Sequence, residues 1–427
     1  MVLCLVRSTS RTLGLKKFTP EDDIFVDEEV LRDNHTPDEL LEREEQLDEY
    51  QNALKPVVKG TRPKNIFLVG QTGVGKTVAT DLIRQRMEID QEDLHNVDVE
   101  FVYLNCKKLT SSYAVAANLV NCFRSDDDQI TTTGYPPDMV YNMLYKEFIE
   151  LDATHVLVVL DEVDAIGDDD NILYELPRAN DHGEVPPEET YVGVIGISND
   201  FTFRDGLSAQ VKDSLAEEEI HFPPYDANQL GTILEHRAEN AFVDGVLEDD
   251  VIPLCAAFAG QESGSARQAL KLLYKAGDLA RKEDAPLVSE DHVRRAEPIV
   301  KENKIRRELE KLPTQSHLTL YALLLLESED ALPAKSAEIY KRYAVVAQII
   351  DADVKTERTI RDRLSQLKLK GFLAKTRENR GEVGGRYDLY EFGEVDPDLF
   401  HDVLMGISRI QQLTETGETD LSAYNVG

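Results

Sequence analysis

Short apolar segments alternate with longer amphipathic segments between about Asp33 and Asn199. The run Val156–Leu160 is apolar at every position, which is typical of a strand buried on both faces of a parallel sheet. Because helical segments separate the apolar runs, we predict an α/β layered domain whose ligand lies at the carboxyl ends of the strands. The predicted strands are Ile66–Val69, Val99–Leu104, His155–Leu160, Tyr191–Ser198 and Glu219–Phe222.

The pattern changes at Pro223-Pro224. Asp226 is placed to cap a helix, and the chain keeps helical spacing from there to about Asn303. We therefore predict that the second domain is entirely helical. The apolar positions of its first helix are Leu230, Ile233, Leu234 and Ala241.

A third pattern follows the charged stretch Lys301–Lys311 and Pro313. An apolar helix over Leu318–Leu326 precedes two more helices and a glycine-punctuated hairpin over Phe372–Tyr390. Helices followed by a β-hairpin outline a winged-helix domain. The expected division is a flexible arm over residues 1–20, an α/β domain over 21–224, a helical second domain over 225–303 and a winged-helix domain over 304–427.

The overall charge is extreme for a globular chain. The 427 residues include 81 acidic and 47 basic side chains, a formal net charge of −34. This indicates either an acidic partner-binding or disordered protein, or a protein from a cytoplasm at very high salt, where self-repulsion is screened. Acidic residues are spread along the chain rather than collected in one tail, which favours the halophile interpretation.

Cysteine usage and hydropathy favour a cytoplasmic protein with no membrane partner. No apolar run approaches the length of a transmembrane helix. The cysteines lack CxxC spacing and histidine partners, so neither a zinc site nor a disulfide framework is expected. They are Cys4, Cys106, Cys122 and Cys255.

A glycine-rich loop between the first predicted strand and a helix predicts phosphate binding. Its glycines let successive backbone N–H groups turn toward one anion, and the helix N-terminus adds partial positive charge. Lys76 can reach the β- and γ-phosphates, and the Thr77 hydroxyl can bind Mg²⁺. The loop consists of Gly70, Gln71, Thr72, Gly73, Val74, Gly75, Lys76 and Thr77.

Polar residues at two other strand ends extend this site. Asp161 and Glu162 follow the strand His155–Leu160, where one carboxylate can hold Mg²⁺ and the other can deprotonate a water. Asn199 follows the next strand and could hold that water or sense the γ-phosphate. Arg267 opens a helix of the second domain and could reach the γ-phosphate, or it could be a solvated surface arginine.

A basic segment in the third domain opposes the overall charge. From Lys355 to Arg386 there are ten Lys and Arg against four Asp and Glu. Ile360, Leu364 and Leu367 form a core stripe on a helix, so its arginines are free to lie toward solvent. We predict a recognition helix in the major groove of double-stranded DNA and a hairpin on the backbone or minor groove. The candidate DNA-binding residues are Thr356 (which also caps the helix), Arg358, Arg361, Arg363, Lys375, Arg377, Arg380 and Arg386.

The predicted DNA binding by the winged helix has an alternative and a constraint from salt. A winged helix with a solvated basic face can instead mediate protein contacts. With ~6 phosphate contacts, a tenfold rise in salt costs ~10⁵ in affinity, so function at high salt needs base-edge contacts, shape contacts or a second contact site.

Taken together, these residues resemble the AAA+ ATPases and, more specifically, the archaeal origin-recognition and cell-division-control type replication initiators. The resemblance extends from about Phe25 to Phe392. Beyond the nucleotide motifs, it rests on Arg43–Leu47, Tyr103–Cys106, Ile197–Asp200, Glu218–Asp226 and Leu312–Ser316.

The resemblance implies an AAA+ αβα nucleotide-binding domain with a parallel sheet, a helical lid and a C-terminal winged helix. It also implies ATP or ADP with Mg²⁺ as cofactors, slow hydrolysis, and as partners origin DNA, the replicative helicase and other initiator paralogues. Tyr225 and the segment Val30–Arg43 are implied to line an adenine pocket. The implied motif roles are Walker A for Lys76 and Thr77, Walker B for Asp161 and Glu162, sensor 1 for Asn199 and sensor 2 for Arg267.

One departure from the family pattern leaves two functions open. The family usually carries Asp-Pro-Arg-Val-Lys where this chain reads Ser208–Lys212, so Gln210 stands at the arginine-finger position. A neutral amide cannot neutralise transition-state charge on a neighbouring subunit's ATP. The chain is therefore expected to be an ATP-gated origin-binding initiator or a regulatory or scaffold paralogue with little ATP turnover. A general ATP-driven motor fits less well.

Overall fold

The computed structural model describes residues 23–33, 35–167, 169–215, 218–379, 386–393, 395, 397–407 and 410. The expected arm at residues 1–20 lies outside this range, as does the glycine-rich part of the expected hairpin, Gly381–Gly385. The chain divides between Ala296 and Glu297 into two compact units, which are considered separately. No helix in the described part of the chain is long and apolar enough to cross a membrane.

The first unit is built on a five-stranded parallel sheet with the order β2-β3-β4-β1-β5. All five strands lie where the sequence predicts them, and every residue of β3 is buried. In register, Asn105 pairs with Asp161 and Val69 with Ser198, so the carboxyl ends of these strands share one edge. The strands are β1 (Ile66–Gly70), β2 (Val99–Asn105), β3 (His155–Asp161), β4 (Tyr191–Ser198) and β5 (Glu218–Phe222).

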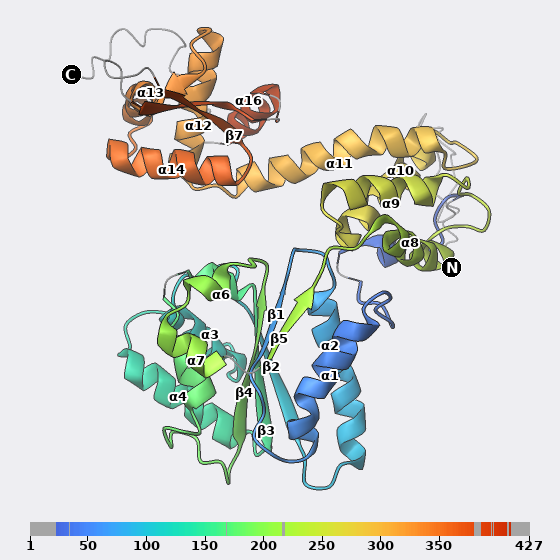
Figure 1. Cartoon of the computed structure of the whole chain (residues 1–427), viewed down its shortest axis with the longest axis vertical. Helices are drawn as coiled ribbons and strands as arrows, with labels where there is room; N and C mark the ends of the chain where they lie inside the picture. The colour runs from blue at the N-terminus through green and yellow to red at the C-terminus, as the bar shows by residue number, and fades with distance from the viewer. Residues whose placement is uncertain are drawn as a thin grey trace, which may run out of the picture. The chain divides into compact units, whose positions relative to one another are not determined.

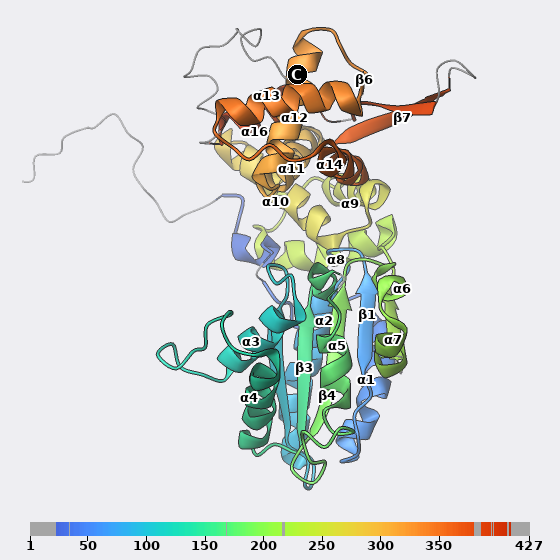
Figure 2. The same cartoon turned by 90° about the vertical axis from the view of Figure 1, so that its left-hand side faces the viewer.

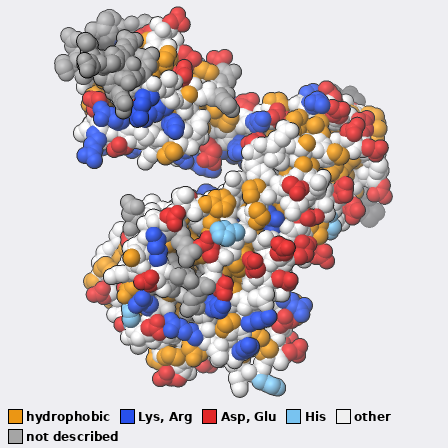
Figure 3. All heavy atoms as spheres, in the orientation of Figure 1, with side chains coloured by type: hydrophobic (Ala, Val, Ile, Leu, Met, Phe, Trp, Pro, Cys, Tyr) orange, Lys and Arg blue, Asp and Glu red, His pale blue; other side chains and the backbone are white. Residues whose placement is uncertain are grey.

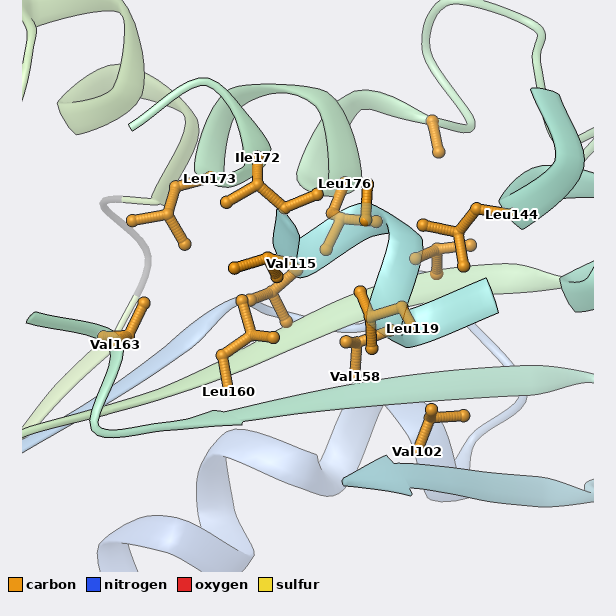
Figure 4. Close-up of a cluster of buried hydrophobic side chains, with 14 of the residues drawn as sticks. Val102, Val115, Leu119, Leu144, Val158, Leu160, Val163, Ile172, Leu173 and Leu176 are labelled. Carbon is orange, nitrogen blue, oxygen red and sulfur yellow. The ribbon is translucent and has the colours of Figure 1, made fainter. Parts of the chain in front are cut away.

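Helices cover both faces of this sheet, with α1 and α2 on one side and α3, α4 and α7 on the other (Figures 1 and 2). Figure 4 shows side chains of β3 meeting those of α3, α4 and α5, among them Val158, Leu119 and Leu144. This buried layer fixes the helices that flank the carboxyl edge of the sheet. The helices are α1 (Glu44–Val58), α2 (Lys76–Asp90), α3 (Ser112–Cys122), α4 (Pro137–Glu150), α5 (Ile172–Glu175), α6 (Phe203–Gly206) and α7 (Ala209–Leu215).

The helical lid follows β5. Asp226 caps α8 as predicted, since its carboxylate accepts from the backbone N–H groups of Asn228 and Gln229 at 2.8 and 2.9 Å. The last helix, α11, continues through the charged stretch and across the division between the two units. The lid helices are α8 (Ala227–Ala241), α9 (Val251–Glu262), α10 (Ala266–Lys282) and α11 (Glu290–Glu310).

The segment before α1 also packs on the lid, a contact for which the sequence has no signal. The Phe25 ring lies 4.8 Å from that of Phe242 and 5.7 Å from that of Tyr274. The N–H of Val26 donates to the Ala241 carbonyl at 2.9 Å. From there the chain continues through a 3₁₀ turn at Glu28–Leu31 toward α1.

The second unit has the predicted winged-helix outline. Its three-stranded antiparallel sheet has the order β6-β8-β7, and Ile360, Leu364 and Leu367 of α14 are buried in its core. The short strand β6 and the last helix were not predicted. The elements are α12 (Thr314–Ser328), β6 (Ala334–Lys335), α13 (Ser336–Ile349), α14 (Glu357–Leu369), β7 (Leu373–Asn379), β8 (Arg386–Phe392) and α16 (Pro397–Met405).

Candidate nucleotide site and nucleic-acid interface

The glycine-rich loop joins β1 to α2, and two of its glycines have left-handed backbone conformations. Gly73 has φ +84° and Gly75 has φ +103°, which L-residues with a side chain rarely adopt. A Cβ at Gly73 would also collide with Ser265 of the lid. The carbonyl of Gly73 accepts from the N–H of Ala266 at 3.0 Å, so the lid contacts the loop through backbone atoms.

Lys76 is 4% exposed and its ammonium rests on three oxygens. It donates to the carbonyls of Gly70 and Gln71 at 2.7 and 2.8 Å, and to Asn199 Oδ1 at 3.0 Å. Desolvation lowers the pKa of Lys76 to about 8, although Asp161 opposes this shift. The structure therefore brings together the cation and the amide that the sequence singled out.

Asp161 lies at the buried end of β3, and one of its oxygens has two donors. Asp161 Oδ2 accepts from Thr77 Oγ1 at 3.2 Å and from the hydroxyl of Tyr103. Burial raises the pKa of Tyr103, so this hydroxyl keeps its proton and donates. Thr77 and Asp161 form the oxygen pair expected for Mg²⁺. The in-register neighbour strand β2 contributes Tyr103, which was not among the predicted site residues.

Glu162 follows Asp161 with a left-handed backbone, φ +52°, which is uncommon for a residue other than glycine. Its carboxylate pairs with the ammonium of Lys107 at 2.7 Å. The next acid, Asp164, accepts from the N–H of Asn199 at 3.0 Å and so joins the ends of β3 and β4. Lys107 and Asp164 are further site residues that no sequence motif indicated.

Arg267 is the second residue of α10 and is about half exposed. Its Nε lies 3.7 Å from Asp33 Oδ1, and the ammonium of Lys271 lies 2.6 Å from Asp33 Oδ2. The segment before α1 thus supplies a carboxylate to the lid cations at the mouth of the site.

Arg43 has a buried guanidinium. The resemblance placed this residue at the end of a segment implied to line an adenine pocket, but its contact with the glycine-rich loop was not predicted. It is 1% exposed, and its Cζ lies 3.5 Å from the centre of the Tyr225 ring. It donates to the carbonyls of Val74 at 3.1 Å, Glu42 at 2.8 Å and Pro223 at 2.5 Å. Because Val74 belongs to the phosphate loop, Arg43 fixes that loop to the strand exit before the lid.

Residues of the glycine-rich loop, of the strand ends and of the lid line one pocket within the first unit, between base and lid. Residues 32, 33, 35, 37 and 39–41 and the lid residues Ile233, His236 and Arg237 complete its wall. The apolar and polar groups of this wall suit the nucleobase of a nucleotide. The opposite wall, formed by the glycine-rich loop, offers backbone N–H groups and Lys76 to phosphates. The pocket gathers Lys76, Thr77, Asp161, Glu162, Asn199, Tyr225 and Arg267.

The structure confirms the predicted cap and core of α14 but contradicts the expected orientation of one arginine. Thr356 Oγ1 accepts from the N–H of Thr359 at 3.3 Å, and Arg358 and Arg361 are exposed. Arg363 does not lie free toward solvent: it is partly buried, and its Nη1 donates to Ser316 Oγ at 3.2 Å. Its Nε is buried without a hydrogen-bond partner among the described residues.

The hairpin cations lie beside an acid. Lys375 and Arg377 both pair with Asp388 of β8. Arg380 lies outside the described residues, and Arg386 begins β8 with its side chain not described. Figure 3 shows Lys and Arg side chains gathered over the part of the second unit that holds α14, whereas acidic side chains predominate over the lid.

Known families match three parts of the chain. Residues 59–189 match the AAA domain, 231–298 the Cdc6 AAA+ ATPase-type lid domain, and 307–403 the CDC6 C-terminal winged helix domain. The solved structure of the Aeropyrum pernix ORC1 protein in complex with DNA is 32% identical, with a TM-score of 0.79, and covers 92% of this chain and 100% of that one.

Two relatives come from Haloarcula marismortui, a halophilic archaeon, as the acidic composition predicted. The ORC1-type DNA replication protein 1 is 58% identical over 422 residues, 95% of this chain and 98% of the relative. The ORC1-type DNA replication protein 11 is 44% identical over 382 residues, 90% of this chain and 91% of the relative. With identity of this extent across base, lid and winged helix, the chain belongs to the ORC1/Cdc6 family of DNA replication initiators.

Proposed function

We propose that this chain is an ATP-gated initiator that binds origin DNA and helps recruit or load the replicative helicase. One observation carries the proposal: a single pocket gathers Lys76, Asp161 and Asn199 from the base with Arg267 from the lid. A nucleotide in this pocket would contact both parts, so nucleotide state would bias the lid and, through it, DNA engagement.

Each pocket residue has a proposed role. The Lys76 ammonium exchanges its hydrogen bonds with three protein oxygens for contacts with the β- and γ-phosphates. Thr77 and Asp161 would hold Mg²⁺, which neutralises phosphate charge when bound. Glu162 orients and deprotonates the attacking water once Lys107 releases it, and Asn199 holds that water.

The lid role rests on Arg267. Its guanidinium contacts Asp33 weakly, at 3.7 Å between exposed groups, so the γ-phosphate can displace this carboxylate at little cost. Tyr225 lines the base-binding side together with the segment before α1. The proposed limits of base, lid and winged helix are residues 21–224, 225–303 and 304–427.

The DNA role rests on the second unit. The exposed Arg358 and Arg361 of α14 suit base edges in the major groove, and the cations of β7 suit phosphates. The solved complex of the Aeropyrum pernix ORC1 protein with DNA, at 32% identity to this chain, supports this proposal.

Footprinting on candidate origin repeats, with and without ATP, tests the proposal. We expect protection at lower protein concentration with ATP, and no ATP effect in Lys76→Ala. Arg267→Ala should still bind nucleotide but protect DNA equally with ATP and ADP. Equal affinity for random and origin DNA at high salt would contradict the proposal.

A second candidate, a regulatory or scaffold paralogue with little turnover, is favoured by Gln210. This residue is exposed on α7 and carries no charge for a neighbour's transition state. Two ORC1-type relatives come from one organism, so the existence of paralogues is compatible with this candidate. Gln210→Arg, assayed for ATPase in a mixed assembly, distinguishes the candidates, because an unchanged rate would remove the argument for the regulatory role.

A further inference from the structure

Two cations of β7 share one carboxylate across the hairpin. The ammonium of Lys375 lies 2.6 Å from Asp388 Oδ2, and Nε of Arg377 lies 3.1 Å from Asp388 Oδ1. Arg377 and Asp388 are opposite each other in the β7–β8 register, so the backbone itself sets this pairing. Both oxygens of Asp388 are therefore engaged by cations proposed to contact DNA.

The group that Asp388 resembles is a DNA phosphate. A carboxylate and a phosphate both offer anionic oxygens to the same N–H donors, at similar distances. The Lys375 ammonium, and then the Arg377 guanidinium, hold the pKa of Asp388 below its usual range, so the acid stays ionised at neutral pH. The three side chains together carry one net positive charge instead of two.

Exposure decides how the three groups can meet a duplex. The side chain of Arg377 is 68% exposed, whereas those of Lys375 and Asp388 are 26% and 29% exposed. The carboxylate thus lies partly beneath the guanidinium rather than beyond it. DNA can approach Arg377 without first expelling Asp388, but it meets a cation whose charge is already partly compensated.

We propose that Asp388 is a built-in counterion of the DNA-binding hairpin, which lowers affinity at low salt and makes binding less dependent on salt. The inference rests on the proposed function, since it requires that this unit binds duplex DNA. The basic stretch counted in the sequence ends at Arg386, two residues before Asp388, which is why the count did not reveal it.

The physical reason is counterion release. Each phosphate neutralised by a protein cation releases condensed ions, which gives a slope of about −0.9 in a plot of log affinity against log salt concentration. A cation already neutralised by its own chain contributes less to this slope. Because Asp388 is covalently attached, its local concentration does not change with bulk salt, which suits a protein that must bind DNA in a concentrated electrolyte.

The test measures affinity of the full chain for a labelled duplex of fixed random sequence over a tenfold range of KCl. Asp388→Asn should steepen the slope by about 0.9. The ratio of its DNA affinity to that of wild type should therefore rise about eightfold as KCl falls tenfold. Glu391→Gln is the matched control, because it makes the same charge change on β8 but faces the other side of the strand. Its slope should equal that of wild type.

A double-mutant cycle excludes a merely structural effect. In a Lys375→Gln, Arg377→Gln background, Asp388→Asn should leave the slope unchanged, since no cation remains for it to compensate. If wild type binds DNA but Asp388→Asn and Glu391→Gln have equal slopes, the inference is wrong and the proposed function stands. The same holds if Asp388→Asn binds more weakly than wild type at every KCl concentration. Absence of duplex binding by wild type would overturn the proposed function and this inference with it.

Discussion

Lys76 is buried and its ammonium donates to three oxygens. Burial lowers its pKa, and nucleotide affinity should therefore fall at alkaline pH. Phosphate binds the ammonium form, and the pKa of Lys76 in the protein is about 8. Affinity for ADP should therefore be flat below pH 8 and fall above it, by up to about tenfold per pH unit, because binding must then take up a proton.

Isothermal calorimetry in two buffers of different ionisation enthalpy measures this uptake directly. We expect close to no proton uptake at neutral pH and nearly one proton well above pH 8. Lys76→Met should bind weakly and lose the pH step. An affinity that stays constant far into the alkaline range would show that the ammonium keeps its proton in the free protein.

Arg43 predicts a different effect, on stability and loop order. Its guanidinium donates to three backbone carbonyls and stacks on the Tyr225 ring. A lysine ammonium cannot reproduce this planar arrangement of donors. Arg43→Lys should cost about 2 kcal/mol of unfolding free energy and weaken nucleotide binding. Chemical denaturation checks the first effect. The control is Arg84→Lys, a partly exposed residue of α2 that pairs with Glu88 and is expected to change stability little.

At this scale the sequence predicted the residues that form local motifs and missed those that act across the fold. Lys76, Thr77 and Asp161 stand next to a strand end and a glycine loop, which makes them recognisable. Arg43 and Tyr103 reach the site from a preceding segment and a neighbouring strand. Their contacts depend on sheet order and register, which no local pattern encodes.

At the scale of elements, one backbone hydrogen bond joins the lid helix α10 to the phosphate loop. The donor is the N–H of Ala266, the first residue of α10, where proline is well tolerated. Ser265 before it is extended, as a residue preceding proline must be. Ala266→Pro should remove this bond at a cost of about 1 kcal/mol while α10 stays folded.

The functional result should be a smaller difference between ATP and ADP affinities, measured by fluorescence titration. Ala227→Pro makes the same change at the first residue of α8, for which no bond to the loop is found among the described residues. It should leave the ATP and ADP affinities as in wild type. An Ala266→Pro variant with unchanged discrimination would show that the loop and lid communicate by another route.

The helix α14 allows stability and DNA contact to be separated. Leu364→Ala removes a fully buried side chain and should destabilise the second unit by about 2–5 kcal/mol. Arg358→Ala changes an exposed side chain and should weaken DNA binding while the melting temperature stays the same. Thermal melts and DNA titrations of both variants check this; a melting temperature lowered by Arg358→Ala would contradict it.

The periodicity of apolar residues predicted the helices and strands well. It failed to predict the orientation of a side chain at the edge of the buried apolar stripe of a helix. All five strands, the Asp226 cap and the core of α14 follow from spacing and cap chemistry. Arg363, however, lies about 60° around the helix from Ile360, at the flank of the buried stripe, whereas Arg358 lies on the opposite side. A flanking arginine can turn either way, and the neighbouring α12 decides by offering Ser316.

For the whole molecule, the charge of −34 opposes the compact state at low ionic strength. Salt also weakens the exposed helical ion pairs, but each of these contributes only about 0.3–0.5 kcal/mol, so screening of the collective repulsion should dominate. The melting temperature should therefore rise steadily as KCl increases from about 0.2 to about 2 M. Scanning calorimetry measures it, and a falling melting temperature would mean that the pairs dominate.

The packing of Phe25 has a practical consequence for anyone who dissects this molecule. The four lid helices follow one another in the chain, yet Phe242 and Tyr274 are covered by the ring of Phe25, which precedes α1 and all five strands of the base domain. A Cβ at Gly277 would strike the Phe25 ring, so the two surfaces fit closely. No single proteolytic cut can release the lid intact: a fragment beginning at Tyr225 would leave two aromatic rings bare and prone to aggregate, unless a peptide spanning residues 23–33 were added back.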